Sequence, residues 1–138
     1  MRKLLGLAAA ACVIAGTVLP ATAADVTFDR MLKADTDPNN WILHSQNYSN
    51  WRYSTLSQIN KGNVDKLQAK FMFSIGRDTK ADCQEEGTPL VNDGFMYVTN
   101  AWSKLMKVDV RSGTEGVPLW RFDPKSEVCR SNKGPALL

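Results

Sequence analysis

Few side chains in this sequence are suited to catalytic chemistry. His44 is the single histidine, and it stands in an apolar stretch beside Trp41 and Leu43. A zinc site or a serine-type triad needs histidine together with converging partners, so a lone histidine in this setting argues against both. We therefore expect His44 to be a hydrogen-bonded structural side chain.

The sequence contains three cysteines, Cys12, Cys83 and Cys129. Lipidation of Cys12 is one alternative, but the apolar run continues well past it, which disfavours that reading. Cys83 and Cys129 would be free to pair in an oxidising compartment, and closing that loop would stabilise the fold by on the order of 4 kcal/mol in the chain-entropy model. Two independent thiols are the alternative, and the spacing leaves both open.

The first 24 residues have the pattern of an export signal. Two cations precede an apolar run from Leu4 to Leu19, and small residues follow it. The run is shorter than the ~20 residues that span a bilayer. We predict a signal peptide over residues 1–24, cleaved near Ala23 or Ala24.

The net charge of the chain does not indicate a strongly charged binding partner. Without the signal the chain keeps 15 Lys and Arg against 14 Asp and Glu, so the sequence pI of ≈ 8.8 belongs largely to the discarded segment. A near-neutral domain provides no argument for nucleic acid, and we expect none as a partner.

Residues 25–69 are predicted to form a segment of loops and short helices. The aromatic-rich stretch 41–53 keeps neither the helical nor the strand period, which favours an ordered loop layer. Asn63 follows turn residues and is expected to cap a short helix over residues 64–67.

From residue 70 onward the pattern changes to strands. Alternating apolar residues and the turn at Asn92-Asp93-Gly94 predict hairpins, because these turn residues tolerate the left-handed backbone. A second hairpin turns through residues 111–116. The expected strands are residues 71–75, 89–91, 95–99, 105–110 and 117–122.

Successive antiparallel strands without a crossover helix exclude a doubly wound α/β fold and predict an all-β meander. Four such strands make one blade of a β-propeller, and a lone blade leaves apolar faces that further blades must cover. We expect residues 70–138 to hold the first blade or blades, with the last residues before Leu138 beginning another strand. On this interpretation the sequence is truncated at its C-terminus.

Several short motifs occur in a fixed order along the chain. They include Asn40-Trp41, Arg52-Tyr53-Ser54, Phe73-Ser74-Ile75-Gly76 and the segments 86–91 and 93–98. In order and spacing these motifs resemble the methanol and ethanol family of quinoprotein dehydrogenases. The resemblance implies an eight-bladed β-propeller that binds pyrroloquinoline quinone (PQQ) together with a calcium or lanthanide ion.

The resemblance assigns two residues to the cofactor. Glu86 matches a glutamate that hydrogen-bonds the quinone, and the alternative is an exposed Glu85-Glu86 pair. Lys133, in Asn132-Lys133-Gly134, stands where the family has an arginine that pairs with the cofactor. Lysine keeps the charge but acts as a point charge without the two-pronged contact, and simple surface exposure is the alternative.

Two further expectations follow from the resemblance. The family ties adjacent blades together through a docking motif, which here corresponds to Asp109, Gly113 and Trp120, with a longer turn than usual. Many relatives also carry two adjacent cysteines before the Asn-Arg-Gly segment, whereas this chain has only Cys129 there. Our hypothesis is that Cys129 pairs with Cys83 and ties two cofactor-facing loops together.

By resemblance, the chain is the N-terminal part of a periplasmic enzyme that oxidises an alcohol by hydride transfer to PQQ and passes electrons to a cytochrome c. A homodimer is compatible with the family. The metal ligands and the catalytic base are expected beyond Leu138, so we nominate no catalytic residue and no metal ligand here and expect the chain alone to be inactive. The alternative is a non-catalytic propeller that serves as a periplasmic binding or outer-membrane assembly scaffold.

Overall fold

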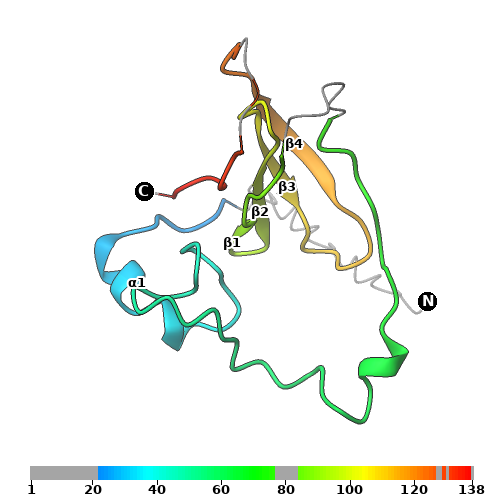
Figure 1. The fold of residues 1–138 in the computed structure, drawn as a ribbon. Coiled ribbons are helices and arrows are strands. Elements are labelled where there is room, and N and C mark those ends of the chain that lie inside the picture. Colours follow the sequence, from blue (N-terminus) through cyan, green and yellow to red (C-terminus); the bar gives the residue numbers. More distant parts are fainter. Residues whose placement is uncertain (1–21, 77–83, 127–128, 130, 138) are drawn as a thin grey trace, which may run out of the picture.

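The computed structural model describes residues 22–76, 84–126, 129 and 131–137. Two parts follow each other along the chain, a layer of loops and short helices and then a four-stranded sheet (Figure 1). The helical elements are α1 (Phe28–Leu32), η1 (Ala34–Thr36) and η2 (Val64–Lys66). The strands are β1 (Leu90–Asn92), β2 (Phe95–Thr99), β3 (Leu105–Asp109) and β4 (Val117–Phe122).

The sheet is a meander in which each strand pairs antiparallel with the next, in the order β1-β2-β3-β4. Asn92 pairs with Phe95, so Asp93 and Gly94 alone form the first turn. Both have positive φ, 49° and 78°, which matches the right-handed twist of a tight hairpin. The two predicted hairpins and the all-β arrangement are therefore confirmed.

The core lies under the two middle strands. Val98, Met106 and Val108 are buried together, and Phe73 and Ile75 pack against them from the segment before the sheet. β4, in contrast, is exposed along its whole length, although it carries several large apolar side chains. These are Val117, Leu119, Trp120 and Phe122. The sheet is thus covered on its inner strands and open at β4.

The N-terminal layer is attached to the first hairpin. Trp41 and Val91 exchange backbone hydrogen bonds of 2.8 and 2.9 Å, and the backbone N–H of Asp93 donates to Oδ1 of Asn40 at 2.7 Å. Arg30 of α1 donates to the side chain of Asn92 at 3.0 Å. These bonds fix the loop layer to the turn between β1 and β2.

Two sequence predictions about local structure are wrong. The residues 71–75 form no strand of this sheet, because their apolar side chains pack onto its face instead of the backbone pairing with an edge. Phe71 and Phe73 lie so close to Gly116 that a Cβ there would be 2.9 Å from the Phe71 ring. The predicted short helix forms as η2 with Asn63 at its N-cap position, but the Asn63 side chain makes no capping bond, because its amide bonds Asn60 and Gln58 instead.

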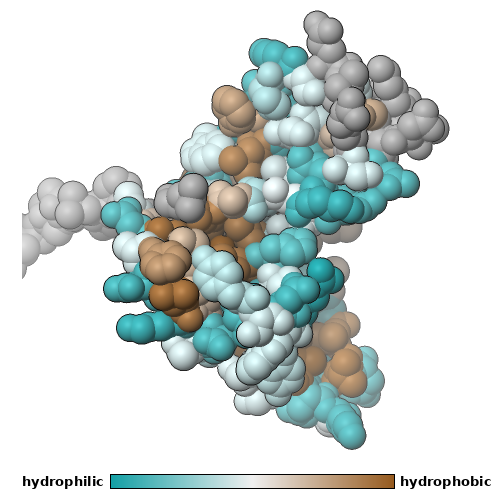
Figure 2. Space-filling model, turned by 60° about the vertical axis from the view of Figure 1, so that its left-hand side comes forward, coloured by the Kyte–Doolittle hydropathy of each residue, from teal (hydrophilic) through white to brown (hydrophobic). Residues whose placement is uncertain are grey.

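The segment between the loop layer and the sheet passes η2 and returns along the side of β4 (Figure 1). Many large apolar side chains between residues 51 and 72 are exposed, including Trp51, Ile59, Leu67 and Met72. Figure 2 shows apolar side chains uncovered on this face of the molecule, in agreement with the exposed large apolar residues of the described chain. Across the described residues, no helix combines the length and the apolar character needed to cross a membrane. The predicted signal peptide lies almost entirely outside them.

Candidate functional site

Two segments that are far apart in the sequence lie side by side and bring Glu86 and Lys133 together. Glu85 and Asn132 form a parallel β-bridge. The backbone N–H of Glu86 donates to the carbonyl of Asn132 at 3.2 Å, and the N–H of Thr88 donates to the carbonyl of Lys133 at 3.4 Å. The backbone alone therefore aligns the two predicted cofactor residues.

The side chains of Glu86 and Lys133 form an ion pair through Nζ and Oε2. The hydrogen bond from Lys133 holds the pKa of the Glu86 carboxyl below its ordinary value, and the lysine charge adds to that effect. Partial burial acts in the opposite direction. The side chains are 39% and 70% exposed, respectively, so both charges remain open to a ligand.

Two glycines allow these segments to approach closely. Gly134 has a φ of +109°, and a Cβ there would lie 2.8 Å from the carbonyl oxygen of Thr88. A Cβ at Gly87 would lie 3.0 Å from Oγ1 of Thr99 and 3.1 Å from Cα of Gly134. A side chain at either position would push the segments apart and separate the ion pair from its backbone support.

The sequence reasoning did not identify three residues that hold this site. The side chain of Asn132 contacts Thr99 at the end of β2 and Ser103 in the turn before β3. In the motif Asn132-Lys133-Gly134 the resemblance assigns a role to the lysine and none to the asparagine. Thr99 and Ser103 carry no signal in the sequence, because only the folded sheet places them next to Asn132.

Cys129 is in a disulfide in this structure. Cys83, its expected partner, lies outside the described residues, so the pairing stays a prediction.

The residues assigned to blade docking lie on the β3–β4 hairpin. Asp109 accepts hydrogen bonds from Nε and from the second guanidinium nitrogen of Arg111, at 2.9 and 2.5 Å, and this contact lowers the pKa of Asp109 to about 2. Gly113 is in the turn with a φ of +68°. Trp120 packs edge-on against Tyr97, with ring centroids 6.5 Å apart. The described residues form a single four-stranded sheet, so the docking role stays a prediction.

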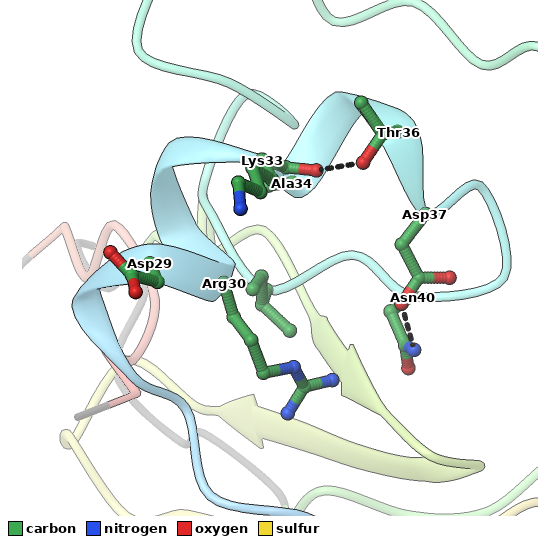
Figure 3. A pocket seen from close by; sticks show the side chains of 8 residues that line it. Asp29, Arg30, Lys33, Ala34, Thr36, Asp37 and Asn40 are labelled. Atoms are coloured by element: carbon green, nitrogen blue, oxygen red, sulfur yellow. Dashed lines mark hydrogen bonds between the residues drawn. The ribbon is translucent and has the colours of Figure 1, made fainter.

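A pocket of ≈ 230 Å³ lies elsewhere, in the N-terminal layer, and all of its lining comes from residues 29–42. Figure 3 shows Asn40 bonded to Asp37 and Thr36 bonded to the backbone carbonyl of Lys33 within its lining. Arg30 is also engaged, since it donates to two backbone carbonyls and to Asn92. Because its polar groups already serve the attachment of the layer to the sheet, this pocket is structural and separate from the Glu86–Lys133 pair.

Residues 41–136 match a protein family described as the PQQ family of glucose, ethanol and alcohol dehydrogenase β-propeller domains. The chain belongs to this family. The match includes the four-stranded sheet and both segments of the Glu86–Lys133 site, so the meander is a part of a PQQ-type β-propeller. The resemblance and the fold class inferred from the sequence are confirmed.

Relatives in this family support the assignment. The chain is 37% identical over 139 residues to the dehydrogenase subunit of a quinone-type alcohol dehydrogenase from Acetobacter aceti, and this match covers 96% of the chain and 18% of the relative. It is 40% identical over 97 residues to a lanthanide-dependent methanol dehydrogenase from Methylacidiphilum fumariolicum, covering 70% of the chain and 15% of the relative.

Solved structures of the PQQ family agree. A quinohemoprotein alcohol dehydrogenase from Pseudomonas putida superposes with a TM-score of 0.70 at 30% identity, over 86% of this chain and 17% of the other. The quinohemoprotein alcohol dehydrogenase of Comamonas testosteroni gives a TM-score of 0.64 at 30% identity, over 81% and 17%. The chain thus spans between 15% and 18% of the length of these relatives.

Proposed function

We propose that this chain is part of a PQQ-dependent alcohol dehydrogenase and that Glu86 and Lys133 belong to its quinone-binding surface. The observation that carries the proposal is the ion pair itself, built on two aligned backbone segments at the positions where the family resemblance places cofactor contacts. The relatives named for quinone and alcohol chemistry support the same reaction.

The residues at this site fit such a ligand. PQQ is a flat anion with carboxylate and carbonyl oxygens, and an ammonium group suits these as a point charge. Lys133 is exposed enough to donate to a ligand oxygen while it stays paired with Glu86, because an ammonium group has three N–H donors. Gly87 and Gly134 let the two segments lie close together, which holds Glu86 and Lys133 next to each other for a shared ligand.

When bound, PQQ together with a calcium or lanthanide ion would supply the hydride-accepting chemistry for oxidation of the alcohol. Lys133 would orient the quinone by holding one of its oxygens. Glu86 would keep the ammonium in place, and its lowered pKa keeps it ionised, so it would also accept a hydrogen bond from a ring N–H. Neither residue transfers a proton to or from the alcohol, so both are binding residues.

We extend the proposal to the whole protein. The sequence of residues 1–24 supports export, and we place the enzyme in the periplasm, where it would pass electrons to a cytochrome c. The quinohemoprotein relatives support a haem acceptor of this kind. A homodimer is compatible with this arrangement.

The test uses the full natural reading frame that contains these residues. The purified protein, loaded with PQQ and calcium or a lanthanide, should reduce an artificial dye only when an alcohol is present. Lys133→Met should weaken quinone binding by roughly tenfold or more, the value of a hydrogen bond to a charged group. Lys133→Arg should bind at least as tightly as the natural protein.

Lys66→Met, which removes an exposed lysine of η2, is the matched control and should bind as the natural protein does. Absence of quinone binding by the natural protein, or equal affinity in the Lys133→Met variant, would contradict the proposal.

A further inference from the structure

Asn132 is the most connected residue of the candidate site. Its side-chain Oδ1 accepts hydrogen bonds from Oγ1 of Thr99 at 2.5 Å and from the N–H of Gly134 at 2.9 Å. Its Nδ2 donates to Oγ of Ser103 at 3.0 Å. Its backbone bonds the carbonyl of Gln84 and the N–H of Glu86. One half-buried asparagine therefore joins the two site segments to the sheet.

These contacts connect the site to the hairpin of β2 and β3. Thr99 ends β2 and pairs with Leu105 of β3. The turn that carries Ser103 is held by Asn100, whose Oδ1 accepts the N–H groups of Trp102 and Lys104 at 3.0 and 3.1 Å. Asn132 thus rests on the end of a hairpin whose strands form the core.

The ion pair between Glu86 and Lys133 does not by itself fix where the Lys133 ammonium group lies. An exposed ion pair between long side chains gains little free energy and loses rotamer entropy, and Lys133 is 70% exposed. The position of the ammonium therefore depends on where the backbone of residue 133 lies. The neighbouring Asn132 side chain fixes that backbone against β2.

If the Asn132 side chain only shaped its own turn, it would need fewer contacts. The bond from Gly134 N–H to Oδ1 makes a turn within three residues and requires nothing from the sheet. The bonds to Thr99 and Ser103 bridge 33 and 29 residues of sequence, and they do nothing for that turn. They do prevent the segment of Lys133 from shifting relative to β2.

We propose that Asn132 is a positioning residue: through Thr99 and Ser103 it places the Lys133 ammonium where a carboxylate-bearing quinone meets it. This inference rests on the proposed function, because it assumes that Lys133 contacts the quinone. It assigns the accuracy of that contact to a side chain that does not itself touch the ligand.

The test measures quinone affinity in the full natural reading frame, by titration with PQQ and with its uncharged trimethyl ester. The Asn132→Ala variant keeps the backbone bonds to Gln84 and Glu86 and removes only the side-chain contacts. It should bind PQQ about tenfold more weakly and bind the ester almost unchanged. In a Lys133→Met background the same substitution should have no further effect, because the two act through one contact.

Thr99→Val and Thr99→Ser provide a second pair in case Asn132→Ala fails to fold. Valine removes the hydroxyl and should weaken PQQ binding in the same way, whereas serine keeps the hydroxyl and should bind as the natural protein does. Asn63→Ala is the matched control, because it removes an asparagine with a comparable set of local bonds far along the chain.

Each result decides between the two proposals. If the natural protein does not bind PQQ, the proposed function fails and this inference fails with it. If it binds PQQ but the effects of Asn132→Ala and Lys133→Met multiply in the double variant, the positioning role alone is overturned. Equal loss of affinity for PQQ and for the ester would likewise show a general structural effect and overturn it.

Discussion

At the scale of single residues, two ion pairs each lower the pKa of a carboxyl group. Glu86 is held by Lys133, and Asp109 is held by Arg111, and in each case a hydrogen bond from the cation is the main cause of a lowered carboxyl pKa. Both pairs are close to solvent, so their contribution to stability is modest. Their main effect is to keep the carboxyl groups of Glu86 and Asp109 ionised.

The Asp109–Arg111 pair makes the stability of the β3–β4 hairpin depend on pH in the acidic range. The folded-state pKa of Asp109 is about 2, below the unfolded value of about 3.9. A depressed pKa stabilises the fold above the unfolded value, and this contribution is lost as the pH falls toward the folded value. The thermal midpoint of Asp109→Asn should therefore lie below that of the natural protein at pH 6, and the gap should close toward pH 2.

Asparagine at position 109 keeps an acceptor for the N–H of Arg111 and removes only the charge, so the comparison isolates the ion pair. A gap that stays constant between pH 6 and pH 2 would show that the charge of Asp109 contributes nothing to stability.

At the scale of elements, the hairpins were predictable from the sequence and the contacts around them were not. Asn92-Asp93-Gly94 requires left-handed backbone, and the turn forms at Asp93 and Gly94 as expected. The alternation of residues 71–75 predicts a strand that does not form, because apolar alternation also suits an extended segment that packs onto a sheet face. Periodicity reports which side chains are buried and not whether the backbone finds a partner.

In the candidate site, too, some residues were predictable from the sequence and others were not. Glu86 and Lys133 belong to motifs that the sequence displays, so their nomination was possible. Thr99 and Ser103 reach Asn132 only through the register of β2 and β3. That register depends on long-range pairing, which no local pattern encodes.

Gly94 and Gly113 provide a matched test of the two hairpin turns. Both have positive φ, +78° and +68°, but a Cβ at Gly94 would lie 2.4 Å from Cγ of Arg111, whereas a Cβ at Gly113 would meet nothing. Gly113→Ala should cost about 1–2 kcal/mol, the value of the left-handed backbone alone. Gly94→Ala should cost more, because Arg111 is tied to Asp109 and cannot move freely.

The measurement is the change in denaturant midpoint of the two variants in parallel. Equal costs would mean that Arg111 moves aside without penalty and that the contact with Gly94 has no structural role.

At the scale of the whole molecule, the exposed apolar side chains of β4 and the greater length of the relatives both indicate that β4 belongs to a blade face. β4 leaves Trp120 and Phe122 44% and 58% exposed, and the chain spans only 15% to 18% of its relatives. In a propeller each blade packs against neighbours on both sides, so the open strand has the apolar character of a blade face. Apolar surface of this kind promotes association when nothing covers it.

Phe122 provides a test in which the sign of the effect depends on context. In the isolated 138-residue chain, Phe122→Glu should raise solubility, because it places a charge on the open strand. In the full natural reading frame the same substitution should lower the thermal midpoint, since burying an unpaired carboxylate costs free energy. Phe122→Leu keeps the site apolar and should change neither property greatly. If Phe122→Glu were harmless in the longer protein, β4 would stay open to solvent there, and the packing of blades against this strand would have to be abandoned.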